Sequence, residues 1–285
     1  MTFYSARTPS LSFELFPPKT SAGENALYQT VADLCRFRPD VFTCTYGAGG
    51  STRDKTLEIV AEVKKRIGCK TASHLTCVGS TVDQLREYLT QLVERGIDNI
   101  VALRGDPPKG EVSFQPVAGG LRYANELVTL IRAEFPRFGI AVAGYPEVHQ
   151  EAPNAEVDLD NLKRKVDCGA DVIITQLYYD NADFFRFRDR CSAAAIKIPI
   201  VPGLLPVTNL AQIQRITSLC KASLPAEFVT RLGAKDDAEW QFQVGVDQCI
   251  EQTQGLLAAG IPGIHFYVLN KATATSQVLD AVEWR

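Results

Sequence analysis

The stretch from Asn99 to Pro108, N-I-V-A-L-R-G-D-P-P, decides the fold of this chain. Its apolar part ends abruptly in Arg104, Gly105, Asp106 and two prolines. This pattern predicts a buried strand, and such a strand needs cover on both faces, as in parallel sheets flanked by helices. Its polar carboxyl end indicates a functional site, because function in such sheets gathers where strands end.

The same unit of strand followed by helix repeats along the chain. Strands are predicted at residues 12–16, 41–45, 71–75, 99–103, 140–143, 172–175, 200–202 and 264–268. Asp158 is expected to cap a helix over 159–168, and residues 222–237 are expected to interrupt the alternation. Eight alternations in 285 residues favour a closed (β/α)8 TIM barrel, one α/β domain over 1–285, and an open doubly wound sheet is the alternative.

Composition excludes several classes of protein. A net charge of -3 leaves no basic surplus for a phosphate backbone, so a nucleic-acid partner is not expected. No apolar run is long enough to cross a membrane, and residues 1–9 do not form a signal peptide. Eight cysteines without a C-x-x-C pair suit a reducing compartment. We therefore expect a cytoplasmic protein.

Three polar side chains at strand ends are candidates for chemistry. Burial of Glu14 in an apolar strand should raise its pKa and hold it protonated as a general acid, unless it forms an ion pair. Asp106 has the groups to hydrogen-bond a heterocycle, or else serves as a turn residue or partner of Arg104. Gln176 offers both a donor and an acceptor to an amide-like ring edge.

Histidines and glycines leave further alternatives open. His74, His149 and His265 are the three histidines, but none lies in an H-x-H or H-E-x-x-H pattern, so ligand contacts are favoured over a metal site. The glycine turn at 47–50 is either a phosphate cradle or a tight connection from strand to helix.

Eight motifs in this order resemble the catalytic barrel of methylenetetrahydrofolate reductases of the short bacterial type. They cover nearly the whole chain: S-F-E-L-F-P-P-K-T (12–20), T-Y-G-A-G-G-S-T-R-D-K-T (45–56), H-L-T-C (74–77), V-A-L-R-G-D (101–106), Y-P-E-V-H (145–149), N-L-K-R-K-V-D (161–167), I-T-Q (174–176) and H-F-Y-V-L-N-K (265–271). The resemblance implies a barrel without a further regulatory domain, which associates as a homo-oligomer.

The resemblance also implies a flavin enzyme. NADH or NADPH would deliver hydride to FAD, which would then reduce 5,10-methylenetetrahydrofolate to 5-methyltetrahydrofolate in a ping-pong cycle that supplies methyl groups for methionine synthesis. Glu14 would be the general acid that opens the folate ring. Asp106 would contact pterin and flavin, and Gln176 would contact folate and nicotinamide in turn.

The resemblance extends to the ligand-binding residues. The implied FAD contacts are Thr45, Tyr46, Ala48, His74, Arg104, Gly105, Asp106, Tyr123, Ala124, Tyr145, His149, Ala152, Asp158, Asn161, Arg164 and Lys165. Gln212 and Lys271 join Asp106 and Gln176 as folate contacts, although bacterial relatives usually have arginine where this chain has Lys271. The alternatives are another flavin barrel, such as a proline-dehydrogenase-like oxidoreductase, and a catalytically idle folate- or flavin-binding protein.

Overall fold

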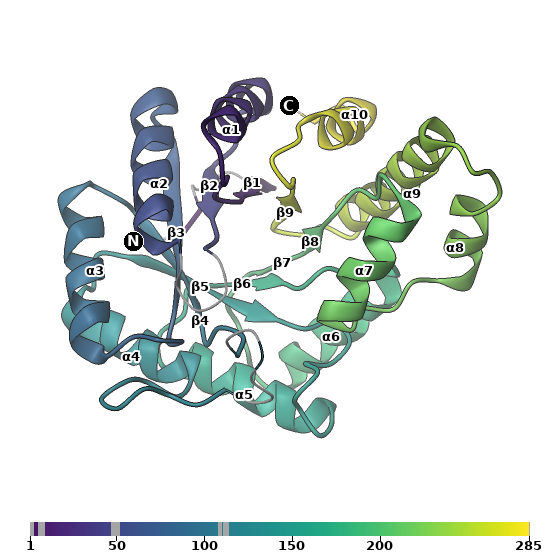
Figure 1. Cartoon of the computed structure of the whole chain (residues 1–285). Helices are drawn as coiled ribbons and strands as arrows, with labels where there is room; N and C mark the ends of the chain where they lie inside the picture. Colours follow the sequence, from purple (N-terminus) through teal and green to yellow (C-terminus); the bar gives the residue numbers. More distant parts are fainter. Residues whose placement is uncertain (1–2, 5–8, 47–51, 108–109, 111–113, 285) are drawn as a thin grey trace.

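A parallel β-barrel forms the centre of the molecule (Figure 1). The computed structural model describes residues 3–4, 9–46, 52–107, 110 and 114–284. Its strands are β1 (Ser10–Leu15), β2 (Val41–Cys44), β3 (Lys70–Thr76), β4 (Asn99–Leu103), β5 (Gly139–Gly144), β6 (Val172–Thr175), β7 (Ile200–Val201), β8 (Gly203–Leu204) and β9 (Gly263–Tyr267). Neighbouring strands pair in the order β7-β6-β5-β4-β3-β2-β1-β9-β8. The predicted α/β barrel is confirmed.

The barrel closes at Pro202, the last residue of the predicted seventh strand, which separates β7 from β8. β7 pairs with β6, and β8 pairs with β9, so the ring is completed through the continuous chain between them. Proline has no N–H to give to a sheet ladder. The carbonyl of Pro202 still accepts a hydrogen bond of 2.9 Å from the backbone N–H of His265. The break therefore costs the ladder a donor and leaves the ring in register.

Helices surround the strands on all sides in Figure 1. They are α1 (Ser21–Leu34), α2 (Arg53–Ile67), α3 (Val82–Glu94), α4 (Ala124–Glu134), α5 (Ala155–Asp167), α6 (Asn181–Ala193), α7 (Leu210–Cys220), α8 (Ala226–Leu232), α9 (Ala238–Ala258) and α10 (Thr273–Ala281), with a short 3-10 turn η1 at Cys35–Phe37. One expectation is wrong, because α5 begins after Asn154, whose side chain accepts from the N–H of Val157, rather than after Asp158. The expected interruption at 222–237 is present, and it contains the short helix α8 in place of a strand.

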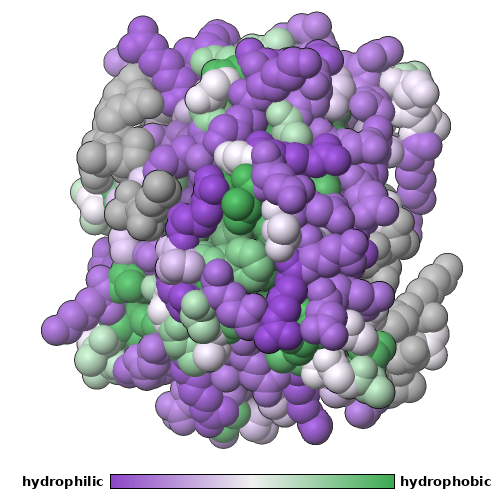
Figure 2. Space-filling view, turned by 90° about the vertical axis from the view of Figure 1, so that its left-hand side faces the viewer, coloured by the Kyte–Doolittle hydropathy of each residue, from purple (hydrophilic) through white to green (hydrophobic). Residues whose placement is uncertain are grey.

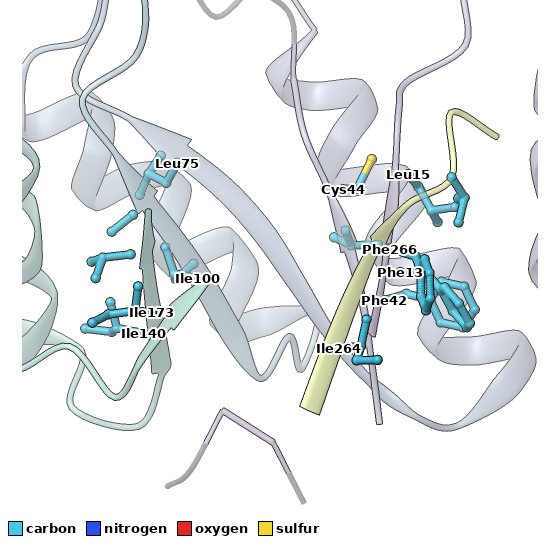
Figure 3. Close-up of a cluster of buried hydrophobic side chains, with 14 of the residues drawn as sticks. Phe13, Leu15, Phe42, Cys44, Leu75, Ile100, Ile140, Ile173, Ile264 and Phe266 are labelled. Atoms are coloured by element: carbon cyan, nitrogen blue, oxygen red, sulfur yellow. The ribbon is translucent and has the colours of Figure 1, made fainter. Parts of the chain in front are cut away.

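Alternate residues of each strand face two different apolar layers. Outward residues pack under the helices, and Phe13, Phe42 and Phe266 gather on one side of β1, β2 and β9, while Ile100 and Ile173 belong to the corresponding group across the barrel (Figure 3). Inward residues form a separate cluster inside the barrel: Val41, Ala72, Val101, Ala141, Val172, Ile174 and Val201, together with Phe3 and Tyr4. Ser12 and Glu14, which alternate with Phe13 along β1, therefore lie on the inner face.

The outer surface is mostly polar. Hydrophilic residues cover most of the face shown in Figure 2, with a limited group of hydrophobic residues near its middle. Within the part of the chain that the structure describes, no helix has the length and apolar character to cross a membrane.

Candidate active site

Two adjoining cavities open at the carboxyl ends of the strands, where a barrel places its functional groups. The first has a volume of about 500 Å³ and the second about 600 Å³. They share walls made by the ends of β4 and β5 and the loop that follows β5: Leu103, Arg104, Ala143, Tyr145 and His149. The two cavities therefore lie side by side on this face of the barrel.

Glu14 lies in the wall of the first cavity between two histidines. Its Oε2 atom is 3.1 Å from Nε2 of His74 and 3.6 Å from Nε2 of His265. All three side chains are buried, with Glu14 only 7% exposed. The 3.1 Å contact has the distance of an ion pair but not the direction of an aligned hydrogen bond, because Nε2 of His74 has no hydrogen-bond partner among the described residues. The sequence did not predict that these residues would lie together.

The expected rise in the pKa of Glu14 is wrong. Burial alone would raise the pKa of this carboxyl, but the neighbouring His74 and His265 outweigh it and lower the pKa to about 2. The carboxylate is therefore ionised in this arrangement.

His265 is held from its other side by hydroxyl groups. Its Nδ1 atom lies 2.8 Å from Oγ of Ser12, which lies 2.9 Å from the hydroxyl of Tyr4. Ser12 and Glu14 are two residues apart on β1, so both project into the barrel. That spacing was a signal in the sequence that could have placed Ser12 beside the site.

The end of β4 and the residues that follow it supply one wall of the first cavity. Arg104, Gly105 and Asp106 all line it, and the side chain of Asp106 is exposed. Arg104 pairs with Glu151 rather than with Asp106, through contacts of 2.5 and 2.6 Å to the two carboxylate oxygens. Gly105 has a φ of +89°, and a Cβ there would lie 2.8 Å from Cγ1 of Val78, so this turn requires glycine.

Gln176 follows β6 and also lines the first cavity. Its Oε1 atom accepts a 2.8 Å hydrogen bond from the backbone N–H of Leu177, which fixes the orientation of the amide. The same cavity has an apolar side that the sequence did not predict. It comes from the β8–α7 and β9 regions and includes Leu205, Ile216, Leu219, Cys220, Tyr267 and Leu269.

The second cavity contains a half-buried cation. Lys165 donates a 2.6 Å hydrogen bond from Nζ to the carbonyl of Ala143. Burial lowers the pKa of Lys165 to about 8, although Asp158 partly opposes that change. Asp158 accepts a 3.0 Å hydrogen bond from the backbone N–H of His149. It thus supports the wall between the cavities instead of capping α5.

Most of the predicted FAD contacts line one or both cavities. The second cavity is lined by Arg104, Tyr123, Ala124, Tyr145, His149, Ala152, Asp158, Asn161, Arg164 and Lys165, and the first by Thr45, His74, Arg104, Gly105, Asp106, Tyr145 and His149. Phe114, from the long loop after Asp106, adds a ring beneath Arg104, whose guanidinium carbon lies 5.3 Å from the ring centre. The loop is therefore part of the site.

Four of the predicted residues stand apart. Tyr46 is buried and lines neither cavity, and its hydroxyl instead accepts a 2.5 Å hydrogen bond from the backbone N–H of Thr76. Ala48 and the glycine turn around it lie outside the described residues. Gln212 and Lys271 follow strand ends at the same side of the barrel, but both are exposed and line neither cavity.

Metal ligation has no support in this geometry. His149 packs edge-on against Tyr145 with ring centres 4.6 Å apart, in the loop after β5. Across the described ranges, no group of three or more histidine, cysteine, aspartate or glutamate side chains is placed to hold a metal ion.

Comparisons with known proteins place these features in a family. The family model described as methylenetetrahydrofolate reductase matches residues 3–283. The chain is 42% identical over 264 residues to the 5,10-methylenetetrahydrofolate reductase of Escherichia coli, covering 92% of this chain and 87% of that one. It is 41% identical over 272 residues to methylenetetrahydrofolate reductase (NADH) 1 of Zea mays, covering 92% of this chain and 46% of the maize protein.

A solved structure supports the fold alone. It is described as an uncharacterized protein from Clostridium thermocellum that binds two copies of 5-methyl-5,6,7,8-tetrahydrofolic acid. Its TM-score is 0.62 at 14% identity, over 97% of this chain and 95% of that one. The family model matches nearly the whole chain, and both relatives described above are more than 40% identical to it. This chain therefore belongs to the methylenetetrahydrofolate reductase family.

Proposed function

We propose that this protein reduces 5,10-methylenetetrahydrofolate to 5-methyltetrahydrofolate, with FAD as the bound cofactor and NADH or NADPH as the reductant. The family and the names of its relatives support the reaction. The observation that carries the proposal is a buried Glu14 between two histidines in a cavity that shares a wall with a second, lysine-containing cavity. The maize relative is named as an NADH enzyme, so NADH is the first reductant to test.

The donor set of the second cavity fits a dinucleotide. Lys165 carries a buried positive charge that has no carboxylate in direct contact among the described ion pairs, and a pyrophosphate would supply the missing anion. Arg164 and Asn161 lie along the same wall, and Tyr123 is half exposed at its edge. FAD bound here would accept hydride from the nicotinamide and pass it to the folate.

Glu14 and its histidines form the proposed proton source. Opening of the folate ring requires a proton at a ring nitrogen, and Glu14 lies 3.1 and 3.6 Å from the imidazole nitrogens of His74 and His265. Glu14 lies at the cavity surface and is proposed as the general acid, which takes its proton from the adjacent imidazole as the substrate binds. Burial of the cluster keeps bulk water from competing for the proton.

The remaining polar groups are proposed to orient the folate. Asp106 would accept hydrogen bonds from the pterin, and Gln176 would contact folate and nicotinamide in turn because it faces the cavity that both must enter. Gln212 and Lys271 would reach the substrate only from outside that cavity. The single ammonium of Lys271 would pair with a carboxylate of the folate tail without the bidentate geometry of arginine.

An anaerobic spectral titration tests the reaction. The purified protein should be yellow, lose its visible absorbance when NADH is added, and regain it when methylenetetrahydrofolate follows. Absence of flavin, or flavin that the folate does not reoxidise, would rule out the proposal. Bleaching without folate turnover would favour another flavin barrel, and ligand binding without bleaching would favour an idle binding protein.

Glu14→Gln separates the acid role from binding. The variant should still bleach with NADH but should reoxidise with folate at least about a hundredfold more slowly, as expected when a general acid is lost. Glu134→Gln, which removes a surface carboxylate paired with Arg86, serves as the control and should behave like the wild type. Unchanged folate turnover in Glu14→Gln would refute the assignment.

The cellular setting follows from the same proposal. We propose a cytoplasmic homo-oligomer that supplies methyl groups for methionine synthesis. Light scattering of the purified protein measures the number of subunits, and methionine dependence of a deletion strain tests the role in the cell.

A further inference from the structure

The amino-terminal end of the barrel is closed by Phe3 and Tyr4. Their side chains are 1% and 8% exposed and pack among the inward residues of the strands. The segment is also held by its backbone, because Asn99 donates to the carbonyl of Phe3 at 3.3 Å and Lys70 donates to the carbonyl of Tyr4 at 3.1 Å. Tyr4 is thus a fixed part of the barrel interior, on the side of His265 away from Glu14.

A continuous polar path runs from Tyr4 to the candidate active site. The Tyr4 hydroxyl is 2.9 Å from Oγ of Ser12, and Ser12 is 2.8 Å from Nδ1 of His265. Nε2 of His265 then lies 3.6 Å from Oε2 of Glu14, an ion-pair distance at which it makes no hydrogen bond to any described residue. Ser12 and His265 are almost fully buried, so solvent does not substitute for any of these contacts.

Donors and acceptors along this path fit one arrangement. An ionised Glu14 only accepts, so the nitrogen of His265 that faces it should carry the hydrogen. In the neutral ring Nδ1 is then an acceptor, and Ser12 must donate to it. The Ser12 oxygen remains free to accept the phenolic hydrogen of Tyr4. While the Ser12 oxygen accepts from Tyr4, it is less able to accept a second hydrogen bond from Nδ1 of His265. The tautomer of His265 with its hydrogen on Nδ1 is therefore disfavoured.

We propose that Tyr4 is a positioning residue that, through Ser12, keeps the Nε2 hydrogen of His265 directed at Glu14. Burial raises the pKa of the Tyr4 hydroxyl, so the phenol stays a donor. The tautomer itself is a property of the folded chain alone. Its consequence for catalysis, an imidazole N–H that is oriented toward the carboxylate of Glu14, rests on the proposed folate reaction.

Nitrogen-15 NMR of histidine-labelled protein tests the tautomer directly. The chain has three histidines, so the spectrum is simple, and His265→Gln identifies the signals of His265. The variant Tyr4→Phe removes one hydroxyl and keeps the ring that closes the barrel. Tyr88→Phe is the matched control, because Tyr88 is also buried and its hydroxyl lies 2.8 Å from Oγ of a serine, Ser73. That pair makes no contact with a histidine ring nitrogen among the described hydrogen bonds.

The wild type at mildly alkaline pH should show His265 with its hydrogen on Nε2. Tyr4→Phe should change the tautomer ratio about fivefold, the effect of one lost hydrogen bond, whereas Tyr88→Phe should leave it unchanged. An unaltered His265 spectrum in Tyr4→Phe, or a wild-type hydrogen on Nδ1, would overturn the proposal. Because the NMR experiment uses no substrate, its result is independent of the folate reaction. A failed spectral titration would therefore not contradict the proposal about the tautomer of His265.

Kinetics add a second readout. If the folate reaction holds, Tyr4→Phe should slow reoxidation of the flavin by folate and leave bleaching by NADH unchanged. A merely structural role for Tyr4 would slow both steps or neither.

Discussion

Replacement of Lys165 by methionine should stabilise the ligand-free protein while weakening dinucleotide binding. The pKa of Lys165 falls from 10.5 to about 8 on folding. Each pH unit is equivalent to about 1.4 kcal/mol, so the buried charge costs about 3 kcal/mol of folding free energy. Residual solvent contact of this half-buried side chain reduces that cost to about 2 kcal/mol.

The variant also loses the hydrogen bond to Ala143, which is worth about 1 kcal/mol. Lys165→Met should therefore raise the free energy of unfolding by about 1 kcal/mol near neutral pH. Both folded and unfolded wild-type chains are protonated below pH 8, so the wild type bears the full cost there. Between about pH 8 and 10.5 the unfolded chain binds more protons, wild-type stability rises, and the advantage of the variant should disappear.

Urea unfolding of flavin-free protein at several pH values measures this directly. Lys163→Met is the control, because Lys163 lies on the same helix in a surface pair with Asp167 and should contribute less than about 0.5 kcal/mol. Titration with FAD should give a dissociation constant at least about tenfold weaker for Lys165→Met, as for a lost charge-assisted contact. A variant that is less stable than the wild type across this pH range, or that binds FAD as tightly, would refute the reasoning.

Two further predictions concern the acid cluster and the barrel closure. The pKa of Glu14 is about 2 in the folded chain and 4.5 ordinarily, so the contribution of Glu14 to stability is present above pH 4.5 and is lost as the pH falls toward 2. In acid unfolding, Glu14→Gln should lack about 3 kcal/mol of this pH dependence. An acid transition as steep as that of the wild type would contradict the low pKa. Gly203→Ala should lower the free energy of unfolding by about 3 kcal/mol in urea titrations, because its Cβ would lie 2.2 Å from the carbonyl oxygen of Thr175. The control Gly68→Ala has a φ of +67° and open space around the new Cβ, and it should lower the free energy of unfolding by about 1 kcal/mol. Equal losses in the two variants would show that packing at β8 is not tight.

The sequence predicts the strands well because they are short, apolar and buried on both faces. Asn99–Leu103 and Val172–Thr175 have the predicted bounds, since each is followed at once by polar residues or a turn. The split at Pro202 was harder to foresee, because a proline normally ends a strand and here the ladder resumes one residue later. Helix α8 was missed because seven residues carry too short a periodic pattern.

Placement of the site was predictable, and its electrostatics were not. Strand ends and motifs located Glu14, Asp106 and Gln176 correctly at one cavity. The pKa of Glu14 depends on His74 and His265, which lie on β3 and β9, on either side of β1 in the sheet. The burial of a side chain can be inferred from the sequence of its own strand. The charges that lie beside it can be predicted only when the register of several neighbouring strands is known.

Departures from ordinary folding rules converge on the two cavities. Glu14 is a carboxylate inside an apolar strand, Lys165 is a cation without a contacting carboxylate among the described ion pairs, and Leu219 is an apolar side chain that is 68% exposed. The placements of Lys165 and Leu219 are unfavourable for a chain without ligands, and all three residues line a cavity wall. Ligands that carry an anion and an apolar surface would relieve both. Because folding stability alone would select against a half-buried cation and an exposed leucine, their position at the cavities is best explained by binding, and the stability gain expected for Lys165→Met measures the cost at one of them.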